Sequence, residues 1–258
     1  MDDIGYGLQF DGWYDRLFPD AEAARRTAKN LAARHPDPAL GSCEFGVGTG
    51  RIAIPLSHQV GEVVGVDSSP QMLAALGRAV REQREPTAAV TAVHADIRSF
   101  RSERRFGLVY AVCATLNQLL SREDQQEVVR RAAELLVPGG LLVLEGHNHP
   151  WVEALHEGRA RTTLFTPYPE PGTGLQTHST FDAGRGLWQC SHIWYEKDGT
   201  TRVGTEYSLL LTPSRTDAYA RAAGLRPAAE GALHGDWEHG EYTEASPTFV
   251  AVYEKPAP

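Results

Sequence analysis

The sequence is poor in cysteine, with three in 258 residues: Cys43, Cys113 and Cys190. Three cysteines this far apart cannot build a disulfide framework, and they lack the paired spacing of a structural zinc site. We therefore expect three reduced thiols that pack as small apolar side chains.

Long apolar segments are also missing. No run of about 18 apolar residues, the length of a membrane-spanning helix, occurs in the chain. The acidic start, Met1-Asp2-Asp3, differs from the basic start of a secretion signal. We expect a cytoplasmic protein without a membrane segment.

The chain has few basic residues, with 25 Lys and Arg against 33 Asp and Glu, and its net charge is −8. Proteins that bind phosphate backbones rely on a positive field, so we expect no nucleic-acid partner. The charge leaves a small-molecule substrate of either sign open. The length and an apolar content of 41% suit one large α/β domain, or such a domain with an insertion.

The order of apolar segments predicts the fold class. Residues 10–34 predict a helix that ends before His35-Pro36, because a proline disfavours helix in the residue before it. Strand and helix patterns then alternate, which predicts a mostly parallel sheet with helices on both faces. The strands are expected at 42–46, 61–67, 88–94, 106–112 and 140–146, and the helices at about 50–58, 69–83 and 121–137.

The second half of the chain has a different texture. Residues 160–211 lack helical periodicity and are rich in Thr, Trp, Tyr and Gly, which predicts antiparallel strands. A helix at about 213–223 and β segments near 226–233 and 247–254 complete the chain. We expect four regions: an N-terminal lid (1–38), a core (39–150), an inserted β lid (151–212) and the completion of the core sheet (213–258).

Polar residues follow three successive strands of the predicted core. The first strand runs into Glu44 and the glycine-rich segment 46–50, the second ends in Asp67, and the third ends in Asp96. Ligands of open α/β sheets bind at these strand ends. A carboxylate after the second strand can accept hydrogen bonds from ribose hydroxyls, and one after the third from an adenine amino group.

The spacing of the glycines narrows the class of ligand that the loop can bind. Dinucleotide sites use G-x-G-x-x-G so that a helix N-terminus meets the pyrophosphate. Here the pattern is G-x-G-x-G, preceded by Glu44. A carboxylate in that place suits a nucleoside whose attached chain carries a cationic amino group and a sulfonium.

Residues 41–147 resemble the class I S-adenosylmethionine-dependent methyltransferases. The resemblance rests on four ordered motifs: E-F-G-V-G-T-G-R at 44–51, G-V-D-S-S-P-Q-M-L at 65–73, A-D-I-R-S-F at 95–100 and L-V-P-G-G-L-L-V-L at 136–144. It implies an α/β fold with a Rossmann-like, seven-stranded, mostly parallel sheet whose last strand is antiparallel. It also implies S-adenosyl-L-methionine as cofactor and S-adenosyl-L-homocysteine as product.

The resemblance assigns roles around the cofactor. Gly46 and Gly48 would pass under the methionine part with Glu44 near its amino end, and Asp67 would hold the ribose. Met72 would pack on the adenine, whose edge Asp96 and Ile97 would read. The residues that it implies for cofactor binding are Tyr14, Glu44, Gly46, Gly48, Asp67, Ser68, Met72, Asp96, Ile97 and Cys113.

The chain also resembles small-molecule methyltransferases of bacterial natural-product and amine metabolism. These often begin with a Tyr-Asp pair, here Tyr14-Asp15, on a helix over the cofactor. Many carry an inserted antiparallel β subdomain between the fifth and sixth strands. We expect a small-molecule acceptor, methylated on N or O and less readily on C, and the insertion is compatible with a homodimer.

His147 is the expected general base, because it follows the fifth strand at the catalytic edge of the sheet. Its alternative role is a hydrogen bond to a loop. His147 and His149 have no acidic cluster beside them, so we expect no metal. The expected substrate-binding residues are Asn117, Trp151, His178 and Trp237, with plain packing as the alternative for the two tryptophans.

The insertion predicts a polar-aromatic sheet face. Turns centred on Gly184 and on Asp198-Gly199 would place three rungs on one face: Thr180, Trp188 and Leu209, then His178, Cys190 and Tyr207, then Gln176, His192 and Thr205. The opposite face would carry Phe181 with Leu187 and Leu175 with Ile193. The mixed face suits the wall of a substrate pocket, and a dimer face or a solvated surface is the alternative.

Three other functions remain open from the sequence. A nicotinamide-dependent oxidoreductase would share the sheet, although the glycine spacing disfavours it. An enzyme that cyclises or cleaves S-adenosylmethionine would share the cofactor loop. A non-catalytic binding module is disfavoured by the complete set of acids.

Overall fold

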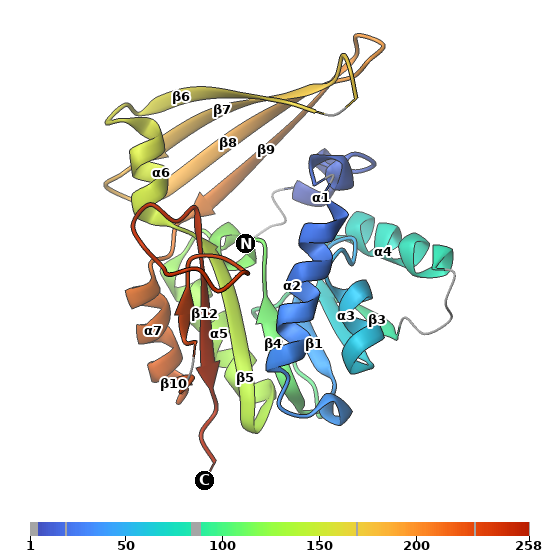
Figure 1. The fold of residues 1–258 in the computed structure, drawn as a ribbon, viewed down its shortest axis with the longest axis vertical. Helices are drawn as coiled ribbons and strands as arrows, with labels where there is room; N and C mark the ends of the chain where they lie inside the picture. The colour runs from blue at the N-terminus through green and yellow to red at the C-terminus, as the bar shows by residue number, and fades with distance from the viewer. Residues whose placement is uncertain (1–4, 19, 84–88, 169, 230, 258) are drawn as a thin grey trace.

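Two sheets make up the molecule: a mostly parallel central sheet and a separate four-stranded antiparallel sheet above it (Figure 1). The computed structural model describes residues 5–18, 20–83, 89–168, 170–229 and 231–257. In these ranges no helix is both long and apolar enough to cross a membrane.

The central sheet has the order β10-β12-β5-β4-β1-β2-β3. The neighbours from β5 to β3 pair in parallel, and β12 runs antiparallel to β5. This confirms the Rossmann-like sheet of seven strands with an antiparallel last strand; a further short strand, β11, pairs with β12. The bounds are β1 Ser42–Phe45, β2 Val63–Asp67, β3 Val90–His94, β4 Phe106–Ala111, β5 Leu136–His147, β10 Arg226–Pro227, β11 Leu233–His234 and β12 Thr248–Glu254.

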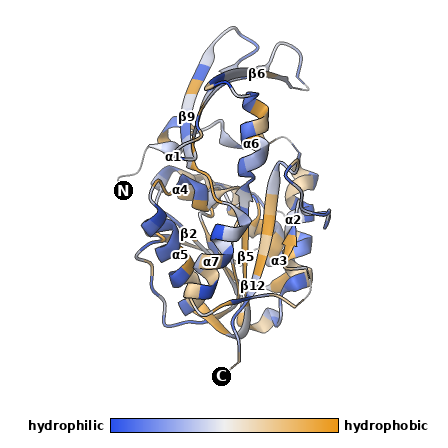
Figure 2. Ribbon diagram, turned by 90° about the vertical axis from the view of Figure 1, so that its left-hand side faces the viewer, coloured by the Kyte–Doolittle hydropathy of each residue, from blue (hydrophilic) through white to orange (hydrophobic). Residues whose placement is uncertain are grey.

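Helices cover both faces of the central sheet because successive strand residues point to opposite sides. On one face Val63 and Leu108 pack with residues of α2, α3 and α4, and on the other Val66 and Val109 pack with α5 and α7. Figure 2 shows hydrophobic central strands between helices whose outer sides are hydrophilic. The bounds are α2 Ala21–Arg34, α3 Ala53–Val60, α4 Pro70–Glu82, α5 Arg122–Leu135 and α7 Pro213–Ala222.

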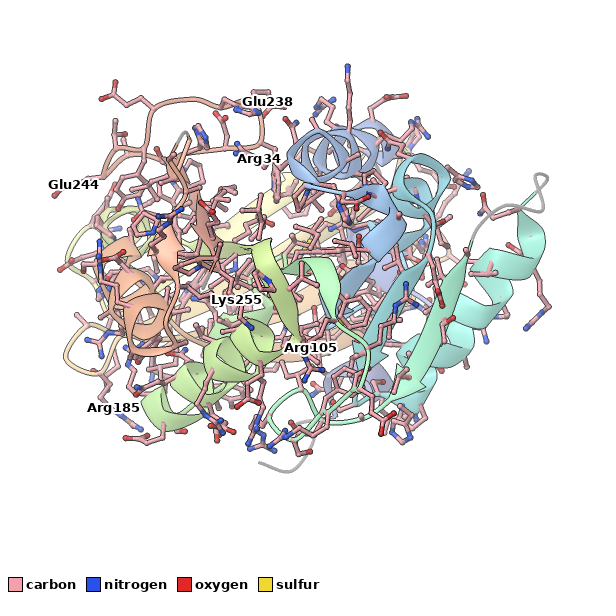
Figure 3. The ribbon with its side chains drawn as sticks, turned by 90° about the horizontal axis from the view of Figure 1, so that it is seen from below. Arg34, Arg105, Arg185, Glu238, Glu244 and Lys255 are labelled. Atoms are coloured by element: carbon pink, nitrogen blue, oxygen red, sulfur yellow. The ribbon has the colours of Figure 1, made fainter. Side chains whose placement is uncertain are left out.

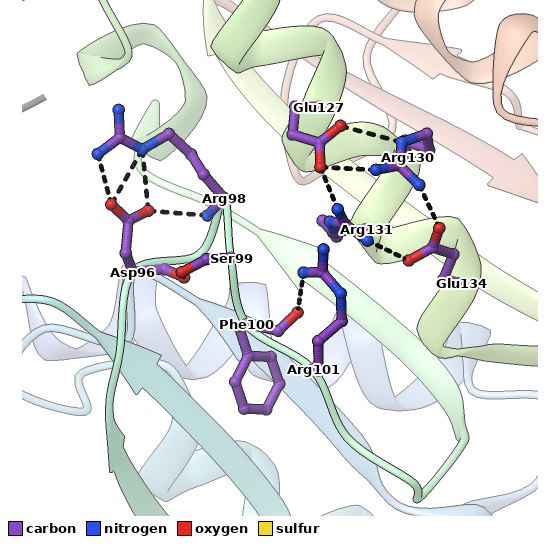
Figure 4. Close-up of polar contacts among 9 residues, drawn as sticks. All are labelled: Asp96, Arg98, Ser99, Phe100, Arg101, Glu127, Arg130, Arg131 and Glu134. Carbon is purple, nitrogen blue, oxygen red and sulfur yellow. Dashed lines mark hydrogen bonds and ion pairs between the residues drawn. The ribbon is translucent and has the colours of Figure 1, made fainter.

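Helix starts follow side-chain caps. Ser69 accepts a hydrogen bond from the Met72 N–H at the start of α4, and Pro70 occupies the first turn. The solvent side of α5 carries ion pairs between Arg and Glu residues one turn apart (Figure 4). Such exposed pairs contribute only about 0.3–0.5 kcal/mol each, so the buried face decides where α5 lies.

The passage from α5 into β5 differs from the prediction. The helix ends at Leu135, and β5 begins at Leu136 with an irregular register opposite β4. The Lys255 ammonium donates to the carbonyls of Ala133 and Leu136, and Figure 3 labels this side chain in a view from below. These hydrogen bonds satisfy carbonyl groups at the end of α5. The helix therefore does not need a glycine to end it, and the glycines at 139 and 140 lie inside β5.

The predicted helix over 10–34 is divided into two pieces, and a further short helix precedes them. Residues Tyr6–Gln9 form α1, Tyr14–Leu17 form a 3-10 turn, η1, and α2 begins only at Ala21. Asp20 starts α2 by accepting hydrogen bonds from the N–H groups of Glu22 and Ala23. The first pieces therefore run separately from α2, and α1 contacts β9 of the upper sheet.

The upper sheet lies between β5 and β10 in sequence and has the order β6-β7-β8-β9. A helix that the sequence did not predict, α6 (His149–His156), leads into it. The strand bounds are β6 Arg161–Pro167, β7 Gly174–Asp182, β8 Leu187–Tyr195 and β9 Thr201–Leu209.

The predicted register of the upper sheet is wrong by one residue at both hairpins. Cys190 pairs with Ser179 and Glu206, where His178 and Tyr207 were expected. The loops comprise residues 183–186 and 196–200, so each centre lies half a residue from the assumed one. Because side chains alternate, this change of parity moves every expected β7 and β9 partner to the other face.

The remaining predicted pairs fail for the same reason. Phe181 pairs with Trp188, and Leu175 pairs with Trp194. The expected rungs of Thr180 with Trp188 and of Gln176 with His192 do not form, because Thr180 pairs with Gln189 and Gln176 with Ile193.

The buried Asn148 side chain ties β5 to the loop before β12. Its amide donates to the carbonyls of Thr243, Glu244 and Ser246, and its oxygen accepts from the Tyr242 hydroxyl. We expect Asn148→Ala to lower the free energy of unfolding by about 3 kcal/mol, because it leaves buried groups unpaired. Chemical denaturation measures this, with the exposed Gln59→Ala as control at below about 0.5 kcal/mol. Equal stability of the two variants would contradict this role.

Candidate functional site

One pocket lies at the carboxyl ends of β1, β2, β3 and β4. Every residue that the sequence predicts for cofactor binding lines it. These residues are Tyr14, Glu44, Gly46, Gly48, Asp67, Ser68, Met72, Asp96, Ile97 and Cys113. Segments from distant parts of the chain therefore converge on the edge where an α/β sheet holds its ligand.

The glycine-rich loop is shaped by its lack of side chains. Gly46 has a φ of 74°, and a Cβ there would lie 2.5 Å from Thr115 Cγ2. Gly48 has a φ of 55°, and its Cβ would meet nothing within 4 Å. The first glycine thus allows close packing below the loop, and the second leaves open space above it.

Asp67 holds this loop in place. Its two carboxylate oxygens accept hydrogen bonds from the N–H of Gly48 at 2.8 Å and of Ser69 at 2.9 Å. The carboxylate therefore lies between the glycine loop and the start of α4. A ribose in the pocket could bind the same carboxylate.

Glu44 is an acid buried at the floor of the pocket, with 2% exposure. The Tyr110 hydroxyl donates to it at 2.9 Å. Burial raises the pKa of Glu44 to about 8, against the lowering effects of the Tyr110 hydrogen bond and of Arg51. The carboxyl group is therefore mostly protonated at pH 7 until a cation lies beside it.

Asp96 is fixed by a neighbouring arginine. Arg98 forms a bidentate ion pair with Asp96 (Figure 4). It also contacts Asp124 of α5 at 3.1 Å. The hydrogen bonds from Arg98 lower the pKa of Asp96, so it stays ionised. This carboxylate and the adjacent Ile97 form the side of the pocket that could face an adenine.

The chain is strained directly after β4. Cys113 and Ala114 have φ values of 52° and 58°, a left-handed conformation that costs non-glycine residues about 1–2 kcal/mol each. The Cys113 N–H donates to Glu145 at 2.7 Å, and Arg51 contacts its sulfur. Desolvation raises the pKa of the thiol to about 12, so it remains protonated.

Sequence reasoning missed three residues around this pocket. Arg51 and Tyr6 line it, and Glu145 bonds to its wall at Cys113. Arg51 directly follows the last glycine of the loop, which is a signal that could have found it. Glu145 becomes recognisable only when β5 is placed next to β4.

The N-terminal segment closes over the pocket. The Asp15 carboxylate accepts a hydrogen bond from the Thr49 hydroxyl at 2.6 Å, and the Arg51 guanidinium lies 4.4 Å from the centre of the Phe18 ring. A Cβ at Gly7 would lie 1.8 Å from Ser69 Oγ, so α1 approaches the start of α4 closely. Tyr14 is held in the pocket wall by these contacts.

The predicted base lies at the upper sheet. His147 packs edge-on against Trp188, with ring centres 5.0 Å apart, and is not among the residues that line the cofactor pocket. Burial lowers the pKa of His147, so the imidazole is neutral at pH 7. Its role as general base stays a prediction.

The four predicted substrate residues are dispersed. Asn117 is fully buried, and within the described ranges neither of its amide atoms has a hydrogen-bond partner. His178 is on the exposed face of β7, bonded to Thr163 and Gln176, because the predicted register was wrong. Trp151 lies on α6 and packs against a cluster that includes Phe181 and Trp188, and Trp237 is among the causes that lower the pKa of Glu145, after burial, which raises it.

Comparison with known proteins finds similarity to methyltransferases. A family model described as a methyltransferase domain matches residues 43–140. The dTDP-3-amino-3,6-dideoxy-α-D-glucopyranose N,N-dimethyltransferase of Streptomyces fradiae is 30% identical over 49% of this chain. The chain spans 46% of that relative's length.

Two further relatives match over longer stretches. The dTDP-3-amino-3,4,6-trideoxy-α-D-glucopyranose N,N-dimethyltransferase of Streptomyces venezuelae is 26% identical over 75% of this chain and 83% of its own length. The solved structure of the CcbJ methyltransferase from Streptomyces caelestis superposes with a TM-score of 0.84 at 28% identity, covering 100% of both chains. The inserted upper sheet is therefore included in the likeness.

Gly46→Ala tests the loop geometry. The new Cβ would collide with Thr115, and we expect at least about tenfold weaker binding of S-adenosylmethionine in calorimetry. Gly61→Ala is the matched control, because its φ is 78° and its Cβ would meet nothing within 4 Å. Both variants should lose about 1–2 kcal/mol of stability from backbone strain. Unchanged binding by Gly46→Ala would show that the loop does not hold the ligand.

Proposed function

We propose that this chain, which belongs to the class I S-adenosylmethionine-dependent methyltransferases, methylates a nitrogen atom of a small molecule. The observation that carries this proposal is the single pocket lined by all ten expected cofactor residues. We take the acceptor to be a polar amine similar to an amino sugar, since two relatives are named as N,N-dimethyltransferases of amino sugars.

The residues of the pocket suit S-adenosylmethionine part by part. Glu44 would bind the cationic amino group, and Arg51 would bind the carboxylate of the same methionine chain. Asp67 would accept from the ribose hydroxyls. Asp96 and Met72, on the other side of the pocket, would hold the adenine between a polar and an apolar contact.

Methyl transfer requires that the acceptor be aligned with the methyl group more than that the acceptor be activated. When bound, S-adenosylmethionine supplies a methyl carbon that its sulfonium makes electrophilic. The nitrogen lone pair forms the new N–C bond while the C–S bond breaks with its electron pair on sulfur, and the nitrogen loses one proton. An amine needs only its neutral form to react. We assign acceptance of the proton to His147, whose lowered pKa keeps it neutral at pH 7.

The direct test is a screen of small amines with methyl-labelled S-adenosylmethionine, followed by mass spectrometry of the products. We expect labelled N-methyl products from amino sugars such as glucosamine and none from glucose, which offers only hydroxyl groups. A reaction with cofactor alone distinguishes a cyclase or lyase, because such an enzyme needs no acceptor. Methylation of hydroxyls, or breakdown of the cofactor without acceptor, would refute the proposal.

The raised pKa of Glu44 predicts coupling between cofactor binding and proton release. At pH 7 a carboxyl group with a pKa of about 8 is about 0.9 protonated. A cationic amino group beside it favours the ionised form, so binding should release up to one proton. The affinity should rise by up to about tenfold from pH 6 to pH 7, where an α-amino group of pKa about 7.7–8.0 stays mostly charged.

Calorimetry in two buffers of different ionisation enthalpy measures the released proton. Glu44→Gln is the control, because it keeps the shape and the hydrogen bond with Tyr110 but cannot ionise. We expect less proton release and a flatter pH dependence in this variant. Identical proton release by the variant and the native protein would rule out the contact between Glu44 and the amino group.

A further inference from the structure

The lower face of the upper sheet carries a polar cluster that the cofactor pocket does not include. In the observed register, Ser179, Cys190 and Glu206 form one rung, and the next carries Thr177, His192 and Gly204. Ser179 and Cys190 are buried, whereas His178 on the other face is exposed. This face therefore looks inward, toward the core.

Glu206 and His192 form the centre of this cluster. His192 Nε2 lies 3.2 Å from Glu206 Oε1, and its Nδ1 lies 2.9 Å from the Thr177 hydroxyl. A neutral imidazole satisfies both contacts if Nε2 donates to Glu206 and Nδ1 accepts from Thr177. His192 therefore orients the carboxylate.

The Glu206 carboxylate stays ionised at neutral pH. Burial is the largest single effect and would raise its pKa, but the hydrogen bond from His192, together with the charges of His192 and His147, outweighs burial and the pKa is lowered. In the described part of the chain no Lys or Arg forms an ion pair with it. Its side chain keeps 23% exposure, so a ligand can reach it.

Aromatic rings surround this negative charge. Phe10 packs edge-on to His192 at 6.1 Å and tilts against Tyr6 at 4.6 Å, while Trp188 meets His147. Aromatic faces attract cations. The surroundings thus suit a group that carries both positive charge and N–H donors.

The cluster is close to the place of methyl transfer. Tyr6 and Tyr14 line the cofactor pocket, and Tyr6 packs against Phe10, which packs edge-on to His192. After burial, the charge of Glu206 is among the causes that raise the pKa of both tyrosines. The Cys113 thiol, on the wall of the same pocket, also raises the pKa of both tyrosines. The two tyrosines therefore connect the cofactor pocket with the face that carries Glu206.

We propose that Glu206, oriented by His192, binds the protonated amino group of the acceptor next to the cofactor pocket. The ammonium must lose one proton before its lone pair can attack the methyl carbon, and the neutral amine stays hydrogen-bonded to Glu206. This rests on the proposed function and adds the acceptor-binding side chain to it. Glu206 would accept hydrogen bonds from the ammonium, and the rings of Tyr6 and Trp188 would flank the carbon atoms beside the nitrogen. The acceptor class is then a cationic primary or secondary amine.

A metal ion is the other ligand that these side chains could suggest. The ligand atoms of Cys190, His192 and Glu206 lie within 4.8 Å of one another. A metal would bind the thiolate, but burial raises the pKa of Cys190, so the thiol is protonated. The chemistry of the cluster therefore favours the amine.

The test measures acceptor binding without turnover. With the protein saturated by S-adenosylhomocysteine, ligand-observed NMR compares glucosamine with glucose as probes that differ in the charged group. We expect the native protein to bind glucosamine at least about tenfold more tightly, and Glu206→Gln to lose this preference. Binding of S-adenosylhomocysteine by the variant, measured by calorimetry, should be unchanged and shows that it is folded.

The controls separate this proposal from the proposed function. Glu153→Gln, an exposed acid on α6, should bind glucosamine like the native protein. His192→Asn should weaken glucosamine binding less than Glu206→Gln, because the carboxylate remains. If Glu206→Gln binds glucosamine normally, this site assignment is wrong even where the native enzyme methylates amines. Loss of binding on adding EDTA would overturn it in favour of a metal.

Discussion

The closed site depends on the contact between α1 and the edge strand β9. An edge strand presents unpaired backbone groups, and here the Thr205 N–H donates to the side chain of Gln9 at 2.9 Å. Gly204 has no side chain, and a Cβ there would lie 2.6 Å from the Phe10 ring. The start of the chain can therefore lie flat against the upper sheet. This contact brings Tyr6 and Tyr14 between the cofactor pocket and Glu206.

The two halves of the site have different physical origins. The cofactor half follows from strand ends, because four parallel strands deliver Glu44, Asp67, Asp96 and Cys113 to one edge whatever follows them in the chain. The acceptor half depends on pairing in the separate upper sheet, where the residues that meet are far apart in sequence. The positions of the residues in the cofactor half are fixed by the buried core, which every sheet of this kind has. The positions of the residues in the acceptor half can change with the lengths of the loops in the upper sheet while the core remains unchanged.

This difference explains what the sequence could predict. The glycine loop and the acids after strands two and three are local patterns, and all of them line the pocket. In the upper sheet the turn residues were recognised, yet loops of four and five residues shifted both registers by one. Cys190 and His192 were expected on one face together, but Glu206 was hidden because the wrong parity put Tyr207 beside them. Turn composition indicates where a hairpin bends and does not fix the number of residues in the bend.

The charges of the site match the charge movement of the proposed reaction. Methyl transfer removes a positive charge from sulfur and creates one on nitrogen, so the group that gains from a fixed negative charge is the acceptor. Glu44, on the cofactor side, has a pKa raised to about 8 by burial and carries little charge at pH 7 until a cation is bound, and burial also raises the pKa of Glu145. Glu206, on the acceptor side, has a lowered pKa and is ionised beforehand. A carboxylate held in place by His192 does not have to reorganise as the ammonium forms, and it therefore favours the transition state and not only the bound amine.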